Sequence, residues 1–253
     1  THLTVVFDPS SGTTFRHEEY PEYKANREEM PEGIRSNVPI IKRLIKACNI
    51  PCLEVEGFEA DDVIGTLSVK GAEAGYKVFM VTPDKDYAQL VNDSVFLYKP
   101  SRMGNGIEIY DREKVEEKFG VGPEFIADFL GLKGDAVDNI PGIPRVGDKT
   151  AVALIKEFGT VEQIVERVDD ISKKSIQKSV RENGQQGLLS KHLATIKIDV
   201  PVEFNEEHLE LGGGNFEDAI AVMGELEFRR SKERLLSTLL FQADAQKDLF
   251  GNP

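Results

Sequence analysis

The chain has 253 residues, enough for one large domain or two smaller ones with hydrophobic cores of their own. It is 40% hydrophobic but has no apolar run of transmembrane length and no signal peptide, so we expect a globular, cytoplasmic protein without membrane contact. Lys and Arg total 31 against 44 Asp and Glu, and this net charge of −13 taken alone argues against nucleic-acid binding. Because the first residue is Thr rather than Met, we expect a piece of a longer protein.

The N-terminal segment combines a short strand with a polar, aromatic stretch. Leu3 to Phe7 predicts a strand that ends at Asp8, and residues 9–27 then mix Lys, Arg and Tyr. This mixture suits phosphate contacts and base stacking, but a solvated helix with a few anchoring aromatic residues explains it equally well. The cations form patches, which keep nucleic-acid binding open despite the net charge: Arg16, Lys24, Arg27, Arg35, Lys42, Arg43 and Lys46, then Lys173, Lys174 and Lys178.

Helix and strand patterns alternate through the first half of the chain. Apolar residues recur at helical spacing from Ile34 to Asn49, where Pro39 is expected to kink or split the helix. Short apolar runs predict strands at 78–81, 94–98 and 107–110. This alternation predicts an α/β fold with a mostly parallel sheet.

Acidic residues crowd the stretch from Gly57 to Asp86. Glu59, Asp61 and Asp62 open a helix that closes at Gly75, and Asp84 and Asp86 follow the predicted strand 78–81. Ligands of open α/β sheets bind beyond the carboxyl ends of the strands. Carboxylates this close repel one another unless a hard cation compensates them. We therefore predict a Mg²⁺ or Mn²⁺ site.

The second half is predicted to be helical from Asp111 to about Asn183. A Gly/Pro-rich turn, residues 133–151, precedes an amphipathic helix and can present backbone N–H groups, Lys149 and Thr150 to a phosphate. Asp135 and Asp138, three residues apart, can add two carboxylates to the metal site. A helix-turn-helix with incidental acids remains the alternative. A strand-like run at 200–204 follows.

Several motifs in this order resemble the 5′-nuclease domain of bacterial DNA polymerase I. They are VVFD (5–8), TFRHE (14–18), YKANR (23–27), GFEADDVIG (57–65), TPDKD (82–86) and GDAVDNIPGI (134–143). The resemblance implies an α/β, PIN-like nuclease domain over residues 1–111, with helices on both faces of its sheet. A helix-three-turn-helix DNA-binding region would follow over 112–200, then a strand and helix packing on the nuclease domain over 201–240, and a linker or tail over 241–253.

The resemblance also implies a divalent-metal-dependent 5′→3′ exonuclease or flap endonuclease of DNA replication and repair. Its substrates would be DNA with a 5′ end or flap and RNA primer–DNA hybrids, and its partner would be a C-terminal polymerase region of the parent chain. Two Mg²⁺ or Mn²⁺ ions about 4 Å apart can activate water and stabilise both oxygens of an in-line displacement.

The residues implied by the resemblance form three sets. Asp8, Glu59, Asp61 and Asp62 would surround the first ion, and Asp84, Asp86, Asp135 and Asp138 the second, some through water. Lys24 and Arg27 would act in catalysis, and Arg16, Tyr23, Lys24 and Arg27 would contact the 5′ strand. Gly142, Arg145, Gly147, Lys149 and Thr150 would hold duplex phosphates, with K⁺ on the carbonyls of the Gly142–Ala151 turn.

Two departures from the family pattern leave alternatives open. Family members begin with an earlier strand that bears a metal-binding Asp, so we expect this piece to lack its first strand and one ligand. Arg145 replaces the first Gly of a Gly-x-Gly turn, where it is either strained by a positive φ or adds a phosphate contact. The competing hypotheses are a non-catalytic DNA-binding fragment and a phosphatase that uses Asp84 and Asp86.

Overall fold

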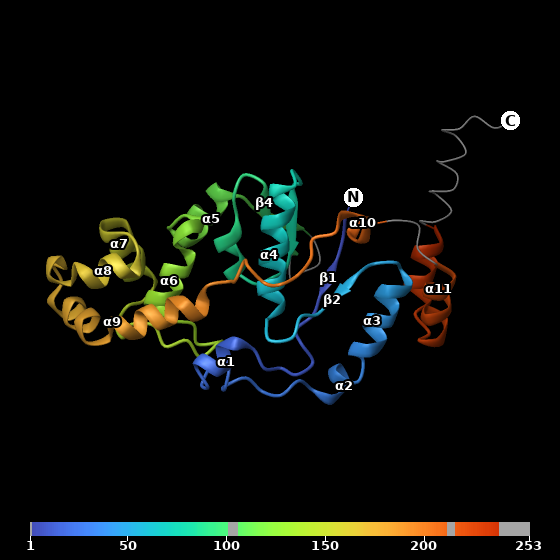
Figure 1. The fold of residues 1–253 in the computed structure, drawn as a ribbon, viewed down its shortest axis with the longest axis horizontal. Coiled ribbons are helices and arrows are strands. Elements are labelled where there is room, and N and C mark those ends of the chain that lie inside the picture. The colour runs from blue at the N-terminus through green and yellow to red at the C-terminus, as the bar shows by residue number, and fades with distance from the viewer. Residues whose placement is uncertain (1, 101–105, 212–215, 238–253) are drawn as a thin grey trace. The chain divides into compact units, whose positions relative to one another are not determined.

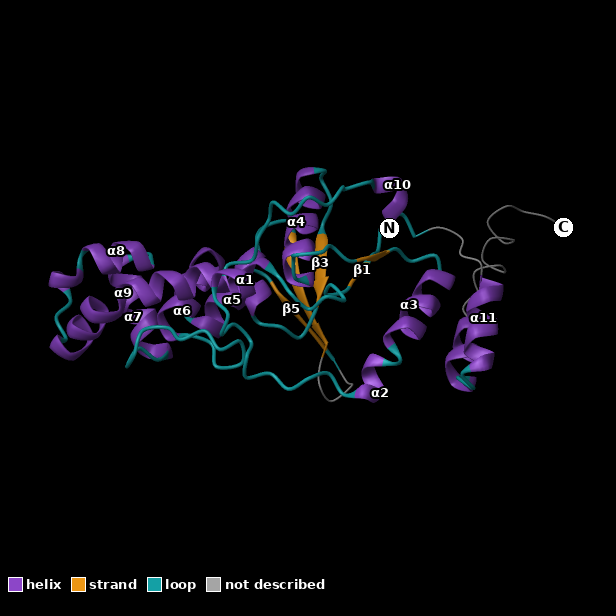
Figure 2. Cartoon of the chain, turned by 60° about the horizontal axis from the view of Figure 1, so that its bottom comes forward, coloured by secondary structure: helices purple, strands orange, loops and turns teal. Residues whose placement is uncertain are grey.

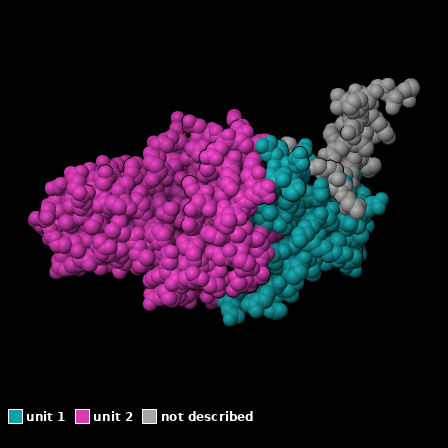
Figure 3. Space-filling view, in the orientation of Figure 1, with its two compact units in different colours: residues 1–6, 29–53, 205–253 teal, residues 7–28, 54–204 magenta. Residues whose placement is uncertain are grey.

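The chain divides into two compact units, each with its own elements (Figures 1 and 3). The structure, a computed structural model, describes residues 2–100, 106–211 and 216–237. Unit 1 comprises residues 1–6, 29–53 and 205–253, and unit 2 comprises residues 7–28 and 54–204. This grouping differs from the predicted boundaries, because the α/β residues that follow 54 and the helical region share one unit. The predicted 241–253 tail lies outside the described residues.

Unit 1 joins a pair of short strands to helices from both ends of the chain. Its strands are β1 (Val5–Val6) and β2 (Cys52–Leu53), which are parallel, and its helices are α2 (Glu32–Arg35), α3 (Val38–Ala47), α10 (Glu206–Leu209) and α11 (Phe216–Glu225). Pro39 lies in the first turn of α3, where a missing N–H is tolerated, so the predicted break falls between α2 and α3. The Arg43 guanidinium on α3 donates to both oxygens of Glu225 on α11, at 2.8 and 3.1 Å.

The sheet of unit 2 has the order β3-β4-β5, and Figure 2 draws its strands in orange. Its strands are β3 (Val78–Val81), β4 (Val95–Pro100) and β5 (Ile107–Tyr110); β3 and β4 are parallel, whereas β4 and β5 are antiparallel. Helix α4 (Ala60–Glu73) packs on β3 and β4. Met80 and Leu97 are buried in the core, whereas Phe79 and Val81, which alternate with Met80, are exposed.

The α/β class and the parallel pairing are as predicted, but one detail of the sheet is corrected. The described strands form two separate sheets, one in each unit, because β1 and β2 are only two residues long each and pair only with each other. In the sheet of unit 2, Phe79 and Val81 are exposed on the face opposite the core.

The predicted helical region is confirmed and completes unit 2. Its helices are α5 (Arg112–Phe119), α6 (Ile126–Lys133), α7 (Asp148–Phe158), α8 (Val161–Glu166) and α9 (Lys174–Ala194), with 3₁₀ turns η2 (Pro123–Phe125) and η3 (Val168–Asp170). Helix α6 packs along α9, and buried apolar side chains of α6 to α9 join the core of the sheet. No helix of the described chain is both long and apolar enough to span a membrane.

The strand predicted at 200–204 is wrong. Val200 N–H donates to Thr66 Oγ1 at 3.1 Å, and Lys70 Nζ donates to the Val202 carbonyl at 2.7 Å. These partners are side chains of α4, so this segment crosses a helix and its backbone polar groups are satisfied there rather than by a neighbouring strand.

Candidate metal and nucleic-acid site

The first group of acids gathers at the N-terminus of α4 in unit 2. Glu59 is the N-cap residue, with extended backbone angles, and Asp62 Oδ2 accepts from its N–H at 3.2 Å. Asp8 Oδ1 accepts from the Ala60 N–H at 2.9 Å, which brings this acid from 52 residues away to the same helix end. The free N–H groups and the positive dipole end of a helix stabilise carboxylates at this position.

The second group follows β3, where the chain turns sharply. Asp84 Oδ1 accepts from the Asp86 N–H at 3.0 Å, which holds the turn that begins the 3₁₀ helix η1 (Asp86–Leu90). Burial, reinforced by the charge of Asp84, raises the pKa of Asp86 to about 7. Burial also raises the pKa of Asp61 to about 6, and Asp84 adds to this shift, although the Tyr87 hydroxyl donates to Asp61 Oδ1 at 2.7 Å. Asp61, Asp84 and Asp86 therefore form one electrostatically coupled cluster.

The third group lies in the loop between α6 and α7. Asp135 Oδ2 accepts from Lys85 Nζ at 2.6 Å, and its Oδ1 accepts from the Val137 N–H at 2.9 Å. Burial raises the pKa of Asp135, but the hydrogen bonds from Lys85 and the Val137 N–H, with the charges of Lys85 and Lys133, outweigh it and leave a net downward shift. The charges of Asp135 and Asp138 both act on Asp86, so the loop adjoins the cluster; the roles of these two acids toward a metal stay predictions.

The donor chemistry of this cluster fits a hard divalent cation. Asp86 Oδ1 is buried without a hydrogen-bond partner within the described chain, a costly state for a carboxylate that a cation would relieve. Asp61, Asp84 and Asp86 are the residues that would hold such an ion. Among the described residues, however, no three acidic, His or Cys side chains converge closely enough to enclose an ion as they stand. The hollow lined by Asp61 and Asp86 measures only about 10 Å³, the scale of one water.

Cationic side chains lie among the same acids. Lys24 Nζ donates to Glu59 Oε1 and lies 3.7 Å from Asp138 Oδ2, and an Arg27 N–H donates to Asp138 Oδ1. The Tyr23 hydroxyl donates to Glu59 Oε2 at 2.9 Å. Tyr23, Lys24 and Arg27 thus lie beside the predicted metal ligands, and their roles toward a substrate stay predictions.

The prediction that Arg16 contacts DNA is corrected. This side chain is only 3% exposed, and its five N–H donors are all used inside unit 2. They bind the carboxylates of Asp62 and Glu59 and the carbonyls of Leu193 and Thr195, at 2.7 to 3.2 Å. Burial lowers the pKa of the guanidinium, but Asp62 raises it more, so the net shift is upward. No donor of Arg16 is left for a phosphate.

The prediction that Asp62 binds a metal is also corrected, because other groups occupy all of its acceptor positions. Its side chain is fully buried. Its Oδ1 accepts from Arg16 Nη2 and from the Lys197 N–H, both at 2.8 Å. Its Oδ2 accepts from Arg16 Nη1 at 2.7 Å and from the Glu59 N–H at 3.2 Å. A carboxylate has about four acceptor positions, so Asp62 has none left for an ion.

The Gly/Pro-rich turn divides into an internal part and an exposed part. The Gly142 N–H donates to Ser190 Oγ at 3.0 Å and its carbonyl accepts from Gln186 at 2.6 Å, so the predicted phosphate contact through the Gly142 N–H is corrected. Arg145 has φ 67°, which confirms that a non-Gly residue at this position is strained. Lys149 and Thr150 lie in the first turn of α7, and Gly147 is its N-cap residue. Lys149 and Gly147 are exposed, whereas Thr150 is half-buried.

Sequence reasoning missed two residues of the site. Lys85 neutralises Asp135, and the Tyr87 hydroxyl binds Asp61. Both stand within one residue of the predicted ligands Asp84 and Asp86, and that proximity in TPDKDY was the available signal.

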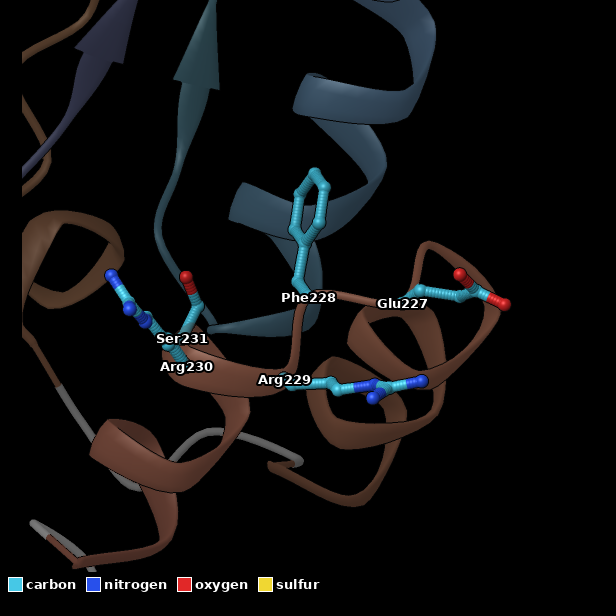
Figure 4. Close-up of a pocket in the computed structure, with 5 residues that line it drawn as sticks. All are labelled: Glu227, Phe228, Arg229, Arg230 and Ser231. Carbon is cyan, nitrogen blue, oxygen red and sulfur yellow. The ribbon is translucent and has the colours of Figure 1, made fainter.

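A larger hollow, of about 290 Å³, belongs to unit 1 (Figure 4). It is lined by five consecutive residues where the turn that follows α11 leads into the helical residues from Arg229 onward: Glu227, Phe228, Arg229, Arg230 and Ser231. Figure 4 shows these side chains pointing away from one another, so they do not converge on a ligand.

An α/β core with a carboxylate cluster at the carboxyl end of β3 and the N-terminus of α4, followed by packed helices, defines an acid-centred α/β protein. Residues 1–120 match the family described as "5'-3' exonuclease, N-terminal resolvase-like domain", and residues 121–217 match "5'-3' exonuclease, C-terminal SAM fold". The chain belongs to the 5′-3′ exonuclease family.

Curated relatives agree with this assignment. DNA polymerase I of Bacillus subtilis is 41% identical over 235 residues, which cover 93% of this chain and 27% of the relative. DNA polymerase I of Pseudomonas aeruginosa is 43% identical over 241 residues, covering 92% and 26%. The chain therefore spans about a quarter of the length of these relatives.

Solved structures share the fold at low sequence identity. T5 5′-exonuclease with bound zinc ions has a TM-score of 0.63 and 22% identity, covering 92% of this chain and 81% of that one. The catalytic core of Rad2 in complex with DNA substrate has a TM-score of 0.62 and 16% identity, covering 92% and 78%. At these identities the likeness concerns the fold alone.

Proposed function

We propose that this chain is a divalent-metal-dependent 5′→3′ exonuclease or flap endonuclease that hydrolyses phosphodiester bonds at 5′ ends or flaps of DNA. Membership of the 5′-3′ exonuclease family supports the reaction class. The observation that carries the proposal is the buried, unpartnered Oδ1 of Asp86 within a cluster that includes Asp61 and Asp84. The zinc ions bound to T5 5′-exonuclease add support for metal dependence.

Asp61, Asp84 and Asp86 would hold the ions, with Asp8, Glu59, Asp135 and Asp138 contributing directly or through water. When bound, two Mg²⁺ or Mn²⁺ ions supply an activated water and neutralise charge on the attacking and leaving oxygens. The chain itself contributes carboxylates whose raised pKa values make them ready to exchange a proton for a cation.

Lys24 and Arg27 would bind the phosphate of the 5′ strand. Lys24 pairs with Glu59 and lies near Asp138, and Arg27 pairs with Asp138, so each cation can exchange a carboxylate partner for a phosphate oxygen without leaving the cluster. Tyr23 is held by Glu59 with only 3% of its surface exposed, so we assign it to orienting Glu59 rather than to base stacking.

Arg145, Gly147, Lys149 and Thr150 would hold phosphates of the duplex. Arg145, Gly147 and Lys149 are exposed, and the turn leads into the N-terminus of α7, where backbone N–H groups favour anions. K⁺ on the carbonyls of the Gly142–Ala151 turn, RNA primer–DNA hybrids as substrates, a polymerase region as the partner and a cytoplasmic location belong to the same proposal. The similarity to DNA polymerase I relatives supports the polymerase region as the partner.

The test is cleavage of a 5′-labelled flap DNA in Mg²⁺, Mn²⁺ and EDTA. We expect release of the flap in either metal, none in EDTA, and a loss of about 100-fold or more in Asp86→Asn with duplex binding retained. Asp93→Asn is the matched control, because it makes the same change at an exposed acid in the turn before β4.

The alternatives predict different results. Duplex binding without cleavage in any metal would refute the nuclease and favour a DNA-binding fragment. Turnover of a phosphomonoester without DNA would favour a phosphatase that uses Asp84 and Asp86.

A further inference from the structure

We propose that Arg16 and Asp62 are positioning residues for the nuclease reaction, which hold Glu59 in place and join the metal-facing end of α4 to the end of α9. This inference rests on the proposed function. It removes Asp62 from the candidate metal ligands and gives it, with Arg16, a role exerted through Glu59.

The first support is the saturation of the pair. Arg16 spends all five donors and Asp62 all four acceptor positions within unit 2. A carboxylate beside a metal site can bind an ion, or a water on that ion, only through acceptor positions that other donors do not use. Asp62 keeps none, and its side chain is fully buried.

The second support is the effect on Glu59. Its Oε2 is held from two sides, by Arg16 Nη1 at 3.2 Å and by the Tyr23 hydroxyl at 2.9 Å. Its backbone N–H is held by Asp62. Its Oε1 accepts a hydrogen bond from Lys24, whose flexible side chain we assign to binding the phosphate of the 5′ strand. Arg16 and Tyr23 therefore hold Oε2 of Glu59 and Asp62 holds its backbone N–H, whereas Oε1, bound by Lys24, is the oxygen that exchanges partners.

The third support is the link to α9. Arg16 Nε donates to the Leu193 carbonyl and Nη2 to the Thr195 carbonyl, both at 2.8 Å. The Gln89 side chain adds a second tie, accepting from the Ile196 N–H at 3.0 Å and donating to the Ala194 carbonyl at 3.1 Å. The end of α9 is thus hydrogen-bonded to Arg16, which precedes Asp61 in the chain, and to Gln89, which follows Asp86.

Helix α9 also carries the contacts of the Gly/Pro-rich turn. Ser190 and Gln186 bind the backbone of Gly142, and Ser179 Oγ donates to the Pro144 carbonyl. The part of α9 that follows Asn183, where non-helical backbone angles interrupt the helix, therefore contacts Gly142 of the proposed duplex-binding turn and, through Arg16 and Asp62, the proposed metal-binding end of α4. Ser179, which binds the Pro144 carbonyl, lies before this interruption.

The experiment compares Arg16→Gln, Asp62→Asn and the double variant, with Asp86→Asn as a ligand variant and Asp93→Asn as the exposed control. Breaking one partner of a buried ion pair leaves an uncompensated charge, whereas the double variant restores a neutral polar pair. We expect each single variant to lower kcat by about 10- to 100-fold with KM for flap DNA unchanged, as for residues that orient metal ligands. The double variant should be no worse than the worse single variant.

Metal binding is measured separately, by calorimetric titration with Mn²⁺. We expect both single variants to keep the wild-type number of bound ions at weaker affinity, whereas Asp86→Asn loses an ion. Arg16→Lys, which retains the charge, should recover part of the loss in kcat and part of the loss in Mn²⁺ affinity. If Asp62→Asn loses an ion while Arg16→Gln keeps the full number, Asp62 is a ligand and the proposal is overturned.

Two further outcomes decide against the proposal. Losses that multiply in the double variant would show that the two residues act independently. Lower melting temperatures with kcat and Mn²⁺ affinity unchanged well below melting would show a purely structural role. If the wild-type chain cuts no DNA, the proposed function fails, but Mn²⁺ affinity and ion number still test whether Arg16 and Asp62 position Glu59.

Discussion

Gly142→Ala is the substitution whose cost the structure defines best. Gly142 has φ 63°, and a Cβ built there would lie 2.3 Å from the Gly134 nitrogen, 2.5 Å from the Lys133 carbonyl carbon and 2.7 Å from the Gly134 Cα. All three atoms are backbone, so no side-chain rotation relieves the contact. The substitution therefore adds a packing conflict to an unfavourable backbone conformation.

The two costs can be separated with Gly12→Ala. Gly12 has nearly the same backbone angle, φ 67°, and belongs to the same unit, but a Cβ there meets nothing within 4 Å. A left-handed Ala costs roughly 1–2 kcal/mol, and overpacking typically adds about 1–3 kcal/mol. We expect Gly12→Ala to lose about 1–2 kcal/mol of unfolding free energy and Gly142→Ala about 2–5 kcal/mol.

The assay is urea unfolding followed by far-ultraviolet circular dichroism, with the midpoints and slopes of both variants compared with those of the parent chain. Gly142→Ala should also weaken duplex binding, because the turn that follows it would shift. Equal losses in the two variants would refute the reasoning, since they would mean that the backbone around Gly134 yields without cost.

Three further predictions follow from individual contacts. In EDTA, the unfolding free energy should fall as pH rises from about 4 to about 7, because Asp86 is harder to ionise in the folded than in the unfolded chain. In Asp86→Asn, the unfolding free energy measured by chemical unfolding should depend less on pH across this range. Lys191→Met should lose about 3 kcal/mol in urea unfolding, since Lys191 Nζ lies 2.7 Å from Asp128, whose side chain is 3% exposed; a loss below 1 kcal/mol would contradict this pairing. Exposed Lys149→Ala should leave stability unchanged, weaken duplex binding and reduce the dependence of log affinity on log salt by about one, as measured by fluorescence anisotropy at several salt concentrations.

Local sequence was sufficient where an element depends on its own residues. The run Val78–Val81 is a strand in the predicted place, and the turn that follows presents Asp84 and Asp86 because their side chains and N–H groups bond to near neighbours. The start of α4 was equally predictable, because acids at a helix N-terminus bind the free N–H groups of the first turn. By contrast, 200–204 reads as a strand but has helix side chains as partners, which local pattern cannot reveal.

The different surroundings of Asp61 and Asp62, which are adjacent in the chain, show what only the tertiary structure decided. Asp61 and Asp62 are equivalent in the sequence, but one step along a helix turns successive side chains by about 100°. Asp61 consequently reaches Tyr87 and the carboxylate cluster, whereas Asp62 turns into the core and meets Arg16, 46 residues away in the chain. A carboxylate can bind a metal only if other donors leave its oxygens free, and those donors come from distant segments brought together by folding. The sequence by itself determined where the acids stand along the chain; the packing of α1 (Phe15–Glu19) and the end of α9 around α4 determined which of them can bind an ion.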